Sequence, residues 1–171
     1  IILEKVLIHV IDVLMHKIAY GIIGYRNHSK KLLDILKKNT KTKTLVYVYK
    51  KNNILKNKKL IKYTNNLNDL DSCKAIIIAS PSNTHFKYLK YFSNKNKYIF
   101  CEKPGVISNK ELVNLKKFNK FKKELIYFNF NYQYSKIIQP FQKALNNKKY
   151  GELLFIYIQS SHGLYFKNNN L

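Results

Sequence analysis

The stretch of sequence that decides the fold is residues 75–105, AIIIASPSNTHFKYLKYFSNKNKYIFCEKPG. Residues 75–79 form a short, continuous apolar run, as a strand buried on both faces of a parallel sheet requires. The next segment, 82–93, has apolar side chains at helical spacing and begins with Ser-Asn, either of which can cap a helix. Residues 98–101 then read as a second strand. The stretch therefore predicts a β-α-β unit.

Glu102-Lys103-Pro104 follows the second of these strands directly. In open α/β sheets, ligands bind beyond the carboxyl ends of the strands, so a lysine held there between a carboxylate and a proline is well placed for chemistry. An isolated Glu-Lys pair would more often be an ordinary surface turn. The neighbouring sequence decides between the two interpretations.

Two motifs in this stretch resemble the Gfo/Idh/MocA oxidoreductases. In that family a strand ends in a Pro-x-x-x-His loop and the next strand ends in Glu-Lys-Pro, as in residues 80–85 (SPSNTH) and 102–104 (EKP) here. The resemblance runs from about Lys17 to about Gly163. Further matches lie outside the central stretch, at residues 21–24 (GIIG), Asn131, residues 151–152 (GE) and residues 161–163 (SHG).

The fold class expected from this resemblance is α/β, a Rossmann-like doubly wound parallel sheet. The resemblance implies a dinucleotide-binding domain over residues 18–130. Residues 131–171 are expected to form the first helix and strand of an α+β second domain, which is incomplete in this sequence. Residues 1–17 are expected to form an extra apolar helix, either packed on the protein or read in from upstream sequence. The strands of the first domain are expected at residues 18–23, 44–49, 60–63, 75–79, 98–101 and 125–129.

The turn after the first strand departs from the usual dinucleotide pattern. The matching positions of Gly-x-Gly-x-x-Gly are Gly24, Arg26 and Ser29, so the first glycine alone is kept. Arg26 either reaches a phosphate or occupies the space of the pyrophosphate, and the start of the following helix still offers free N–H groups to an anion. Cofactor contacts are expected from Gly24, Arg26, Asn27 and His28.

The second strand leads into Lys50 and Lys51 without the acidic residue that would hold the ribose of NAD. Lys50 therefore favours NADP slightly over NAD, unless these are simply two more surface lysines. The resemblance implies further cofactor contacts from residues of the later strand ends, namely Ser80, Pro81, Asn83, His85, Glu102, Lys103 and Asn131. Binding itself stays open because of the altered turn.

Lys103 is the expected catalytic residue. In the family, this lysine orients and polarises a substrate oxygen together with an Asp and a His of the second domain, which would lie beyond Leu171. Relatives commonly carry Gly-Phe-Asn-Tyr-Arg-Phe-Ser where residues 129–135 read NFNYQYS, so Asn129 and Gln133 depart from the pattern. Whether the chain is an active enzyme is therefore open from the sequence.

The composition gives weaker signals about partners. The formal net charge is +23, but the lysines are spread along the chain among many Asn, Ile and Tyr residues, which favours a solvated basic surface over a nucleic-acid site. Residues 1–17 are too short and too charged to span a membrane. Cys73 and Cys101 lack metal-type or redox-type spacing, so no metal is expected and the cytoplasm is the default location.

The resemblance implies an NAD(P)-dependent oxidoreductase-like protein acting on a sugar, sugar-nucleotide or polyol hydroxyl, as a fragment or degenerate member of the family. The alternative is a non-catalytic Rossmann module that binds a nucleotide or a partner. An apolar strand over residues 153–160 is also expected, in the middle of a larger sheet, and it offers a surface for a homo-oligomer.

Overall fold

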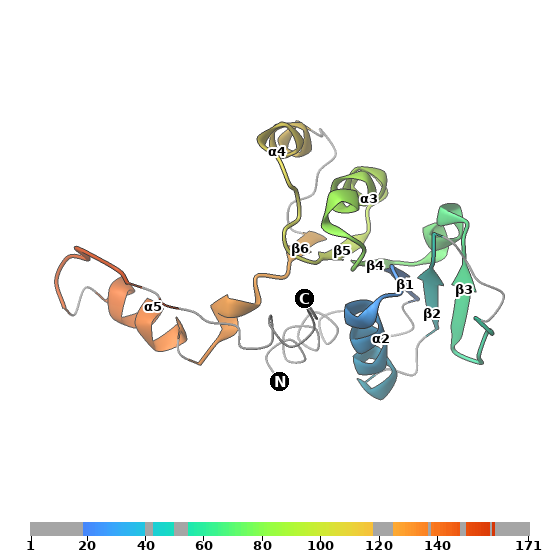
Figure 1. Cartoon of the computed structure of the whole chain (residues 1–171), viewed down its shortest axis with the longest axis horizontal. Helices are drawn as coiled ribbons and strands as arrows, with labels where there is room; N and C mark the ends of the chain where they lie inside the picture. The colour runs from blue at the N-terminus through green and yellow to red at the C-terminus, as the bar shows by residue number, and fades with distance from the viewer. Residues whose placement is uncertain are drawn as a thin grey trace, which may run out of the picture. The chain divides into compact units, whose positions relative to one another are not determined.

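The computed structural model describes residues 19–39, 43–49, 55–117, 125–136, 138–147, 150–157 and 159 (Figure 1). Within these residues, six parallel strands form one sheet in the order β3-β2-β1-β4-β5-β6. This order reverses between β1 and β4, as in a doubly wound sheet. The strands are β1 (Tyr20–Ile23), β2 (Thr44–Tyr47), β3 (Ile61–Thr64), β4 (Ala75–Ile78), β5 (Tyr98–Cys101) and β6 (Ile126–Phe128).

The centre of the sheet is buried on both faces. All four residues of β1 and all four of β4 are buried, which is what their near-continuous apolar sequences predict. The two strands run in register, with Tyr20 opposite Ala75 and Ile23 opposite Ile78. Their carboxyl ends therefore meet side by side, at Gly24 on one strand and Ala79 on the other.

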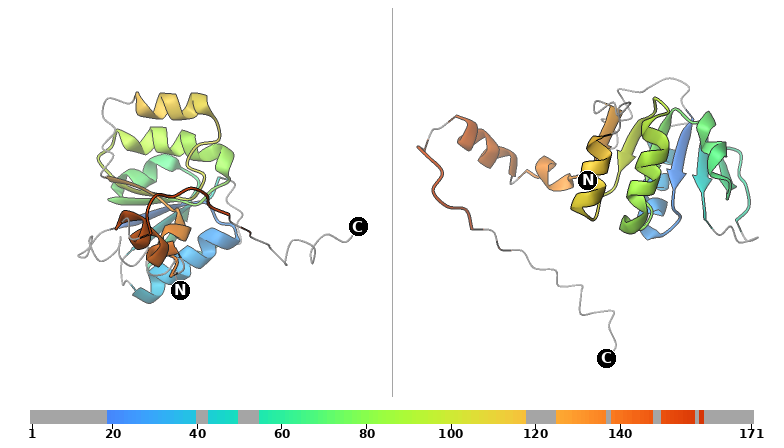
Figure 2. Two further views of the ribbon diagram at one scale, coloured as in Figure 1. Left: turned by 90° about the vertical axis from the view of Figure 1, so that its left-hand side faces the viewer. Right: turned by 90° about the horizontal axis from the view of Figure 1, so that it is seen from above.

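Helices cover both faces of the sheet, and the helix before the strand reversal lies on the opposite face from those after it. Helix α2 (Asn27–Asn39) lies on one face, and α3 (His85–Ser93) and α4 (Asn109–Lys116) lie on the other (Figures 1 and 2). Each main helix turns an apolar stripe inward. The fully buried members are Leu32 and Leu36 of α2 and Leu89 and Phe92 of α3. This arrangement follows from right-handed crossovers on either side of the strand reversal.

The start of α3 differs from the expectation. Residues 82–84 form a short 3-10 turn, and the α-helix begins at His85, so neither Ser82 nor Asn83 caps it. The hydroxyl of Thr84 instead bonds to Ser80 at 2.7 Å and to the Pro81 carbonyl. The loop after β4 is thus held by its own hydroxyl groups before the helix starts.

Helix α4 is capped as the sequence predicts. The Ser108 hydroxyl accepts the N–H of Glu111 at 3.2 Å, and the Glu111 carboxylate accepts the N–H of Ile107 at 2.8 Å. The sequence predicts that this helix runs to about Lys120 with Leu112, Leu115 and Phe118 facing the sheet. Leu115 is buried and the helix packs on α3, but Leu112 is 39% exposed. Residues 118–124, and with them the predicted end of the helix, lie outside the described residues.

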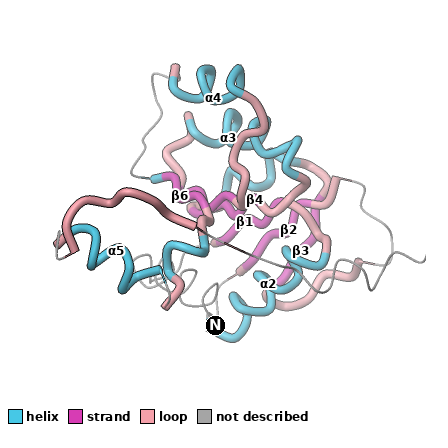
Figure 3. The backbone as a smooth tube through the Cα atoms, turned by 60° about the vertical axis from the view of Figure 1, so that its left-hand side comes forward, coloured by secondary structure: helices cyan, strands magenta, loops and turns pink. Residues whose placement is uncertain are grey.

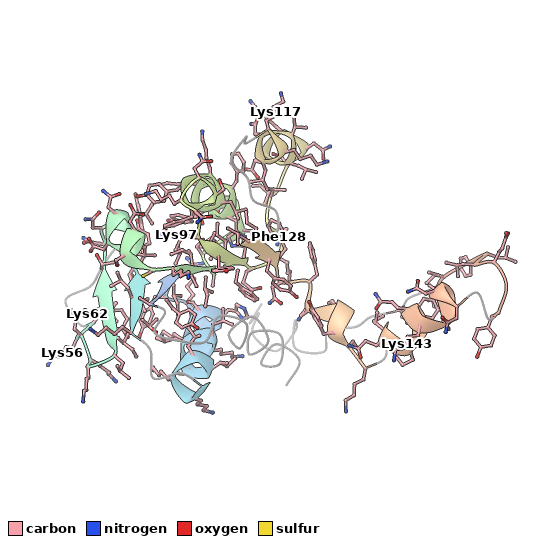
Figure 4. All side chains as sticks on the ribbon, turned by 180° about the vertical axis from the view of Figure 1, so that it is seen from behind. Lys56, Lys62, Lys97, Lys117, Phe128 and Lys143 are labelled. Carbon is pink, nitrogen blue, oxygen red and sulfur yellow. The ribbon has the colours of Figure 1, made fainter. Side chains whose placement is uncertain are left out.

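A buried lysine, Lys97, lies at the amino ends of the strands, opposite the carboxyl ends where Gly24 and Ala79 meet. Lys97 precedes β5 and lies within the folded domain (Figure 4). Its ammonium group donates to the carbonyl oxygens of Asp71 at 2.7 Å and Cys73 at 2.5 Å. The ammonium group has three donors, and two of them bond to these backbone carbonyls. Lys97 is therefore a structural residue at the amino ends of β4 and β5.

The chain divides into two units, residues 1–132 and 133–171. In the second unit, α5 (Ile138–Asn146) forms with Pro140 in its first turn, as predicted. The expected strand at residues 153–160 is not formed in its described part, 153–157 and 159, which is drawn as loop in Figure 3. Leu154 is 93% exposed, and an apolar strand that has no paired neighbour gains no ladder hydrogen bonds. Residues 1–17 lie outside the described residues.

Candidate functional site

The site begins where β1 and β4 end together. Gly24 has φ +107°, and a Cβ built on it would lie 2.7 Å from the Ala79 carbonyl oxygen and 3.2 Å from the Ser80 Cα. Its N–H donates to the Tyr47 carbonyl of β2 at 3.1 Å. Any other residue would suffer both a strained backbone and a clash with backbone atoms. The glycine therefore lets three strand ends approach one another closely.

A cavity of about 770 Å³ opens directly above this contact. Its size is within the range of small-molecule and cofactor pockets. It lies at the strand reversal, where doubly wound sheets bind their ligands. Three chain segments line it: residues 23–26 after β1, residues 47–49 and 55 after β2, and residues 79–81, 84, 87 and 88 after β4.

The turn from β1 into α2 forms one wall. Ser29, at the position of the third glycine in the usual pattern, is buried, and its hydroxyl donates to the Arg26 carbonyl at 2.9 Å. A small side chain with a local hydrogen bond thus fits where glycine is usual. Arg26 is exposed and lines the cavity, and Asn27 begins α2 beside it. The turn thus leads from the end of β1 into the start of α2 and brings a positive charge to the cavity.

Tyrosine rings form much of the remaining wall. Tyr47 and Tyr88 meet edge to face with centroids 6.1 Å apart, and the hydroxyl groups of Tyr25 and Tyr63 are 3.2 Å apart. Burial raises the pKa of Tyr88 to about 12, with a further contribution from the adjacent Tyr47. Burial and the bond to Tyr25 likewise raise the pKa of Tyr63 to about 12. These phenols therefore remain neutral at physiological pH.

A second cluster of polar groups lies around Glu102, at the end of β5. One carboxylate oxygen of Glu102 contacts His28 Nε2 at 2.6 Å and accepts the Asn129 side-chain N–H at 2.8 Å. Burial alone raises the pKa of Glu102, but the bonds from His28, Asn129 and the backbone of Lys103 outweigh it, and the pKa is lowered. Glu102 is therefore a buried carboxylate that stays charged, and it ties α2, β5 and the end of β6 together.

His85 connects the two loops that carry the motifs. It is buried, with Nε2 2.8 Å from the Ser80 carbonyl oxygen and Nδ1 2.8 Å from the Pro104 carbonyl oxygen. A neutral imidazole carries one N–H, so it donates to one of these oxygens and an imidazolium donates to both. The histidine thereby fixes the loop after β4 against the loop after β5.

Residues 18–130 match the family model described as "Oxidoreductase family, NAD-binding Rossmann fold" (GFO_IDH_MocA). The chain belongs to the Gfo/Idh/MocA oxidoreductase family. The sheet order and the residues at the strand ends agree with the fold in that description. No curated protein matches the sequence.

Solved structures share the fold at low identity. The myo-inositol 2-dehydrogenase from Lactobacillus plantarum is 19% identical with a TM-score of 0.62, and the match covers 81% of this chain and 44% of that one. The scyllo-inositol dehydrogenase from Lactobacillus casei with bound NAD(H) and scyllo-inositol is 16% identical, with a TM-score of 0.63 and coverage of 80% and 43%. The WlbA dehydrogenase from Chromobacterium violaceum, in complex with NADH and UDP-GlcNAcA, is 14% identical, with a TM-score of 0.63 and coverage of 80% and 42%.

These structural matches support the Rossmann-type fold of this chain. The matches cover 42–44% of these three solved proteins, so the chain spans about half of their length. No helix among the described residues is long and apolar enough to cross a membrane. The described residues also contain no group of three or more His, Cys, Asp or Glu side chains arranged to hold a metal ion.

The residues predicted from the family motifs fall into two groups in the structure. Gly24, Arg26, Ser80 and Pro81 line the cavity, whereas His28 bonds to Glu102 and His85 bonds to the carbonyls of Ser80 and Pro104. Lys103 is exposed at the end of β5, Asn83 is exposed in the turn before α3, and Asn131 is half-buried after β6. Lys50 lies outside the described residues. The cofactor and catalytic roles of all these residues stay predictions.

Several residues that line the cavity were not singled out as functional from the sequence. Lys87 and Tyr88 line it from α3, and their i+3 and i+4 spacing from Thr84, the residue before the helix, is the signal that groups the three. Asn129 was noted as a departure from the family pattern, but its bond to Glu102 crosses from one strand end to the next. Nothing in the local sequence indicates that pairing.

Proposed function

We propose that this chain binds a nicotinamide dinucleotide in the cavity above Gly24 and works as part of an NAD(P)-dependent oxidoreductase. The observation that carries the proposal is the glycine itself: a Cβ there would lie 2.7 Å from backbone, at the point where parallel sheets of this order bind ligands. The shape of the cavity and the chemistry of its walls both fit such a ligand.

The residues present are suited to a dinucleotide. The first turn of α2 offers backbone N–H groups to a phosphate, and Arg26 adds a charge that glycine in the usual motif lacks. The apolar and aromatic wall around Tyr47 and Tyr88 suits an adenine ring. The exposed Lys103 stands on the side of the sheet where β5 and β6 end, and we assign the nicotinamide half to that side.

Lys103 is the residue we assign to the reacting end of the site. The bound cofactor would supply a hydride acceptor or donor. The lysine ammonium would donate a hydrogen bond to the substrate hydroxyl or carbonyl oxygen and so stabilise negative charge that develops there. His85 and Glu102 would position the loop that carries it, because each is bonded to residues on other elements.

The proposed substrate is a hydroxyl of a sugar, a sugar nucleotide or a polyol. Support comes from the ligands named for two proteins of like fold, scyllo-inositol and UDP-GlcNAcA. Residues 153–160 remain a candidate strand for pairing with a second copy. A reducing compartment such as the cytoplasm suits the two buried free thiols, Cys73 and Cys101.

A non-catalytic nucleotide-binding module is the alternative. The observation that favours it is that the Lys103 ammonium contacts no acid or base among the described residues, although its proposed chemistry needs a proton partner. Under this alternative the cavity binds the dinucleotide and no substrate is turned over. The two functions share the binding step and differ in the chemistry after it.

The binding step is tested by titrating the purified chain with NADPH and NADH while following nicotinamide fluorescence. We expect a saturable signal that adenosine 5′-monophosphate competes away. Arg26→Gln should weaken binding by about tenfold through loss of one charge-assisted phosphate contact, whereas Lys116→Gln on α4 should leave it unchanged.

Absence of saturable binding to both cofactors would overturn the proposal, provided that circular dichroism shows a folded chain. Binding without turnover of inositols or UDP-sugars would favour the non-catalytic module. Turnover that Lys103→Met removes, with cofactor affinity kept, would support the oxidoreductase and the role of Lys103.

A further inference from the structure

The cavity is basic on the side where the adenosine ribose of a dinucleotide would lie. None of the described residues that line it is acidic, and two are cationic, Arg26 and Lys87. In doubly wound folds an Asp or Glu beyond the second strand selects the ribose 2′-hydroxyl of NAD, and a cation there accommodates the 2′-phosphate of NADP. The charge of the cavity wall therefore bears on which cofactor it accepts.

Arg26 and Lys87 stand on different walls. Arg26 follows β1 in the turn that leads to α2, which is the wall for the pyrophosphate. Lys87 lies in the first turn of α3 beside Tyr88, with its Nζ 5.8 Å from the Tyr88 ring centroid. Because the Tyr88 ring packs on Tyr47 at the end of β2, this helix face is turned toward the second strand. Lys87 is thus the described cation of the cavity on the ribose side.

The charges around this wall do not cancel Lys87. Asp34 does not line the cavity, and its charge contributes to the raised pKa of Tyr63, the hydrogen-bond partner of Tyr25. Asp34 is paired with Lys37 at 2.9 Å. Lys30 does not line the cavity, although its Nζ lies 5.0 Å from the ring centroid of Tyr25, which does. An anionic group entering the cavity beside Tyr47 would meet Lys87 without a competing carboxylate among the lining residues.

We propose that Lys87 binds the 2′-phosphate of NADP(H) and makes this chain selective for it over NAD(H). This inference rests on the proposed function, and it adds a specificity residue on α3, outside the loop after β2 where such residues are usually sought. Arg26 contributes to the phosphate that both cofactors share. The two cations then have separable effects on binding.

The test uses ligands that contain the adenosine half alone. Isothermal titration calorimetry compares adenosine 5′-monophosphate, adenosine 2′,5′-bisphosphate and adenosine 3′,5′-bisphosphate on the whole chain. The third ligand has the charge of the second with the phosphate moved, so it measures the general attraction of a chain with a net charge of +23. The variants are Lys87→Gln and, as a matched control on the same helix, the exposed Lys90→Gln.

We expect the 2′,5′-bisphosphate to bind about tenfold tighter than both other ligands, as one charge-assisted contact predicts. Lys87→Gln should remove that preference and leave affinity for the monophosphate unchanged, while Lys90→Gln should keep the preference. The preference should also weaken as salt rises, since Lys87 is exposed.

Equal binding of the two bisphosphates, or a preference that survives Lys87→Gln, would overturn the assignment of Lys87. These outcomes leave the proposed function standing, because the monophosphate still binds. If none of the three adenosine ligands and neither nicotinamide cofactor binds, the proposed function fails first. The two failures are therefore distinguishable.

Discussion

The two halves of the candidate site lie on the same edge of the sheet and are built in opposite ways. The half above β1 and β2 is an open cavity whose walls are rings and exposed cations, over a backbone floor at Gly24. The half at β5 and β6 is closed by hydrogen bonds that converge on the buried carboxylate of Glu102. The family pattern is altered in the open half and kept at Glu-Lys-Pro in the closed half. Side chains that face a cavity can change without disturbing neighbours, whereas the closed half, which also departs from the pattern at Asn129, bonds that new side chain to Glu102.

The largest effect is expected at the floor that supports the open half. Gly24→Ala should lower the free energy of unfolding by about 2–4 kcal/mol, because it combines positive φ with a Cβ contact of 2.7 Å to backbone. Urea unfolding followed by circular dichroism measures the loss. Gly151→Ala is the matched control, since Gly151 has φ +84° with nothing within 4 Å. Equal losses for the two variants would show that strain alone, and not the close approach, makes Gly24 necessary.

The charge of Glu102 should stabilise the closed half. Glu102→Gln should cost about 2 kcal/mol at pH 7, through loss of the charge-assisted bonds from His28 and Asn129. Because the folded-state pKa of Glu102 is lowered from 4.5, its contribution is complete above that value and is lost as pH falls through the folded pKa. The difference in free energy of unfolding between the wild type and Glu102→Gln should therefore shrink as the pH falls below 4.5.

Urea unfolding at pH 7, 5 and 3 checks this dependence. Asp34→Asn removes the same charge from an exposed pair with Lys37 and should change stability by less than about 0.5 kcal/mol. A stability gap for Glu102→Gln that stays constant down to pH 3 would contradict the assignment of a charged, bonded carboxylate.

A smaller effect on stability is expected at Asn129, which stands where the family pattern has glycine. Asn129→Gly should cost about 1 kcal/mol and raise the pKa of Glu102 toward its usual value, since one of its donors is removed. The acid-dependent loss of stability, which begins below the usual Glu pKa in both proteins, should then be smaller in the variant and be complete at a higher pH than in the wild type. An unchanged acid limb would mean that His28 alone sets the charge state of Glu102.

The smallest effect is expected in the wall of the open half. Arg26→Ala should change the free energy of unfolding by less than about 0.5 kcal/mol, because the side chain is exposed. A thermal melt suffices to check it. A loss above 1 kcal/mol would show that Arg26 supports the turn as well as the cavity, and would weaken the contrast between the two halves.

The sequence predicted the sheet well because its signals are local. The apolar runs at residues 75–79 and 98–101 and the β-α-β spacing between them correspond to β4, α3 and β5 with small shifts at the ends. The start of α3 was misjudged because hydroxyl bonds of Thr84 stabilise a 3-10 turn where a cap was expected. The strand over residues 153–160 failed in its described part for a different reason, since strand formation depends on a neighbour that local sequence does not supply.

The candidate site was predictable where a motif carries it. Gly24 and Glu102 follow strand ends directly, and His85 begins the helix after the loop that follows β4. The partners of Glu102 were not predictable, because His28 and Asn129 are 74 and 27 residues away from it in the chain. Lys87 was likewise invisible as a site residue until the face of α3 that meets β2 was known. Contacts between elements that are distant in sequence can be identified only once the fold is known, because no local sequence pattern indicates them.

The floor of the cavity is made of main chain. Where Gly24 meets the Ala79 carbonyl and the Ser80 Cα, the surface offered to a ligand does not depend on which side chains surround it. A lineage whose composition shifts toward lysine, asparagine and tyrosine can thus exchange the walls residue by residue without losing the hollow. Such a protein can change the ligand that it binds while its fold stays constant. Gly24 is the exception, because any side chain there would clash with the backbone of the cavity floor.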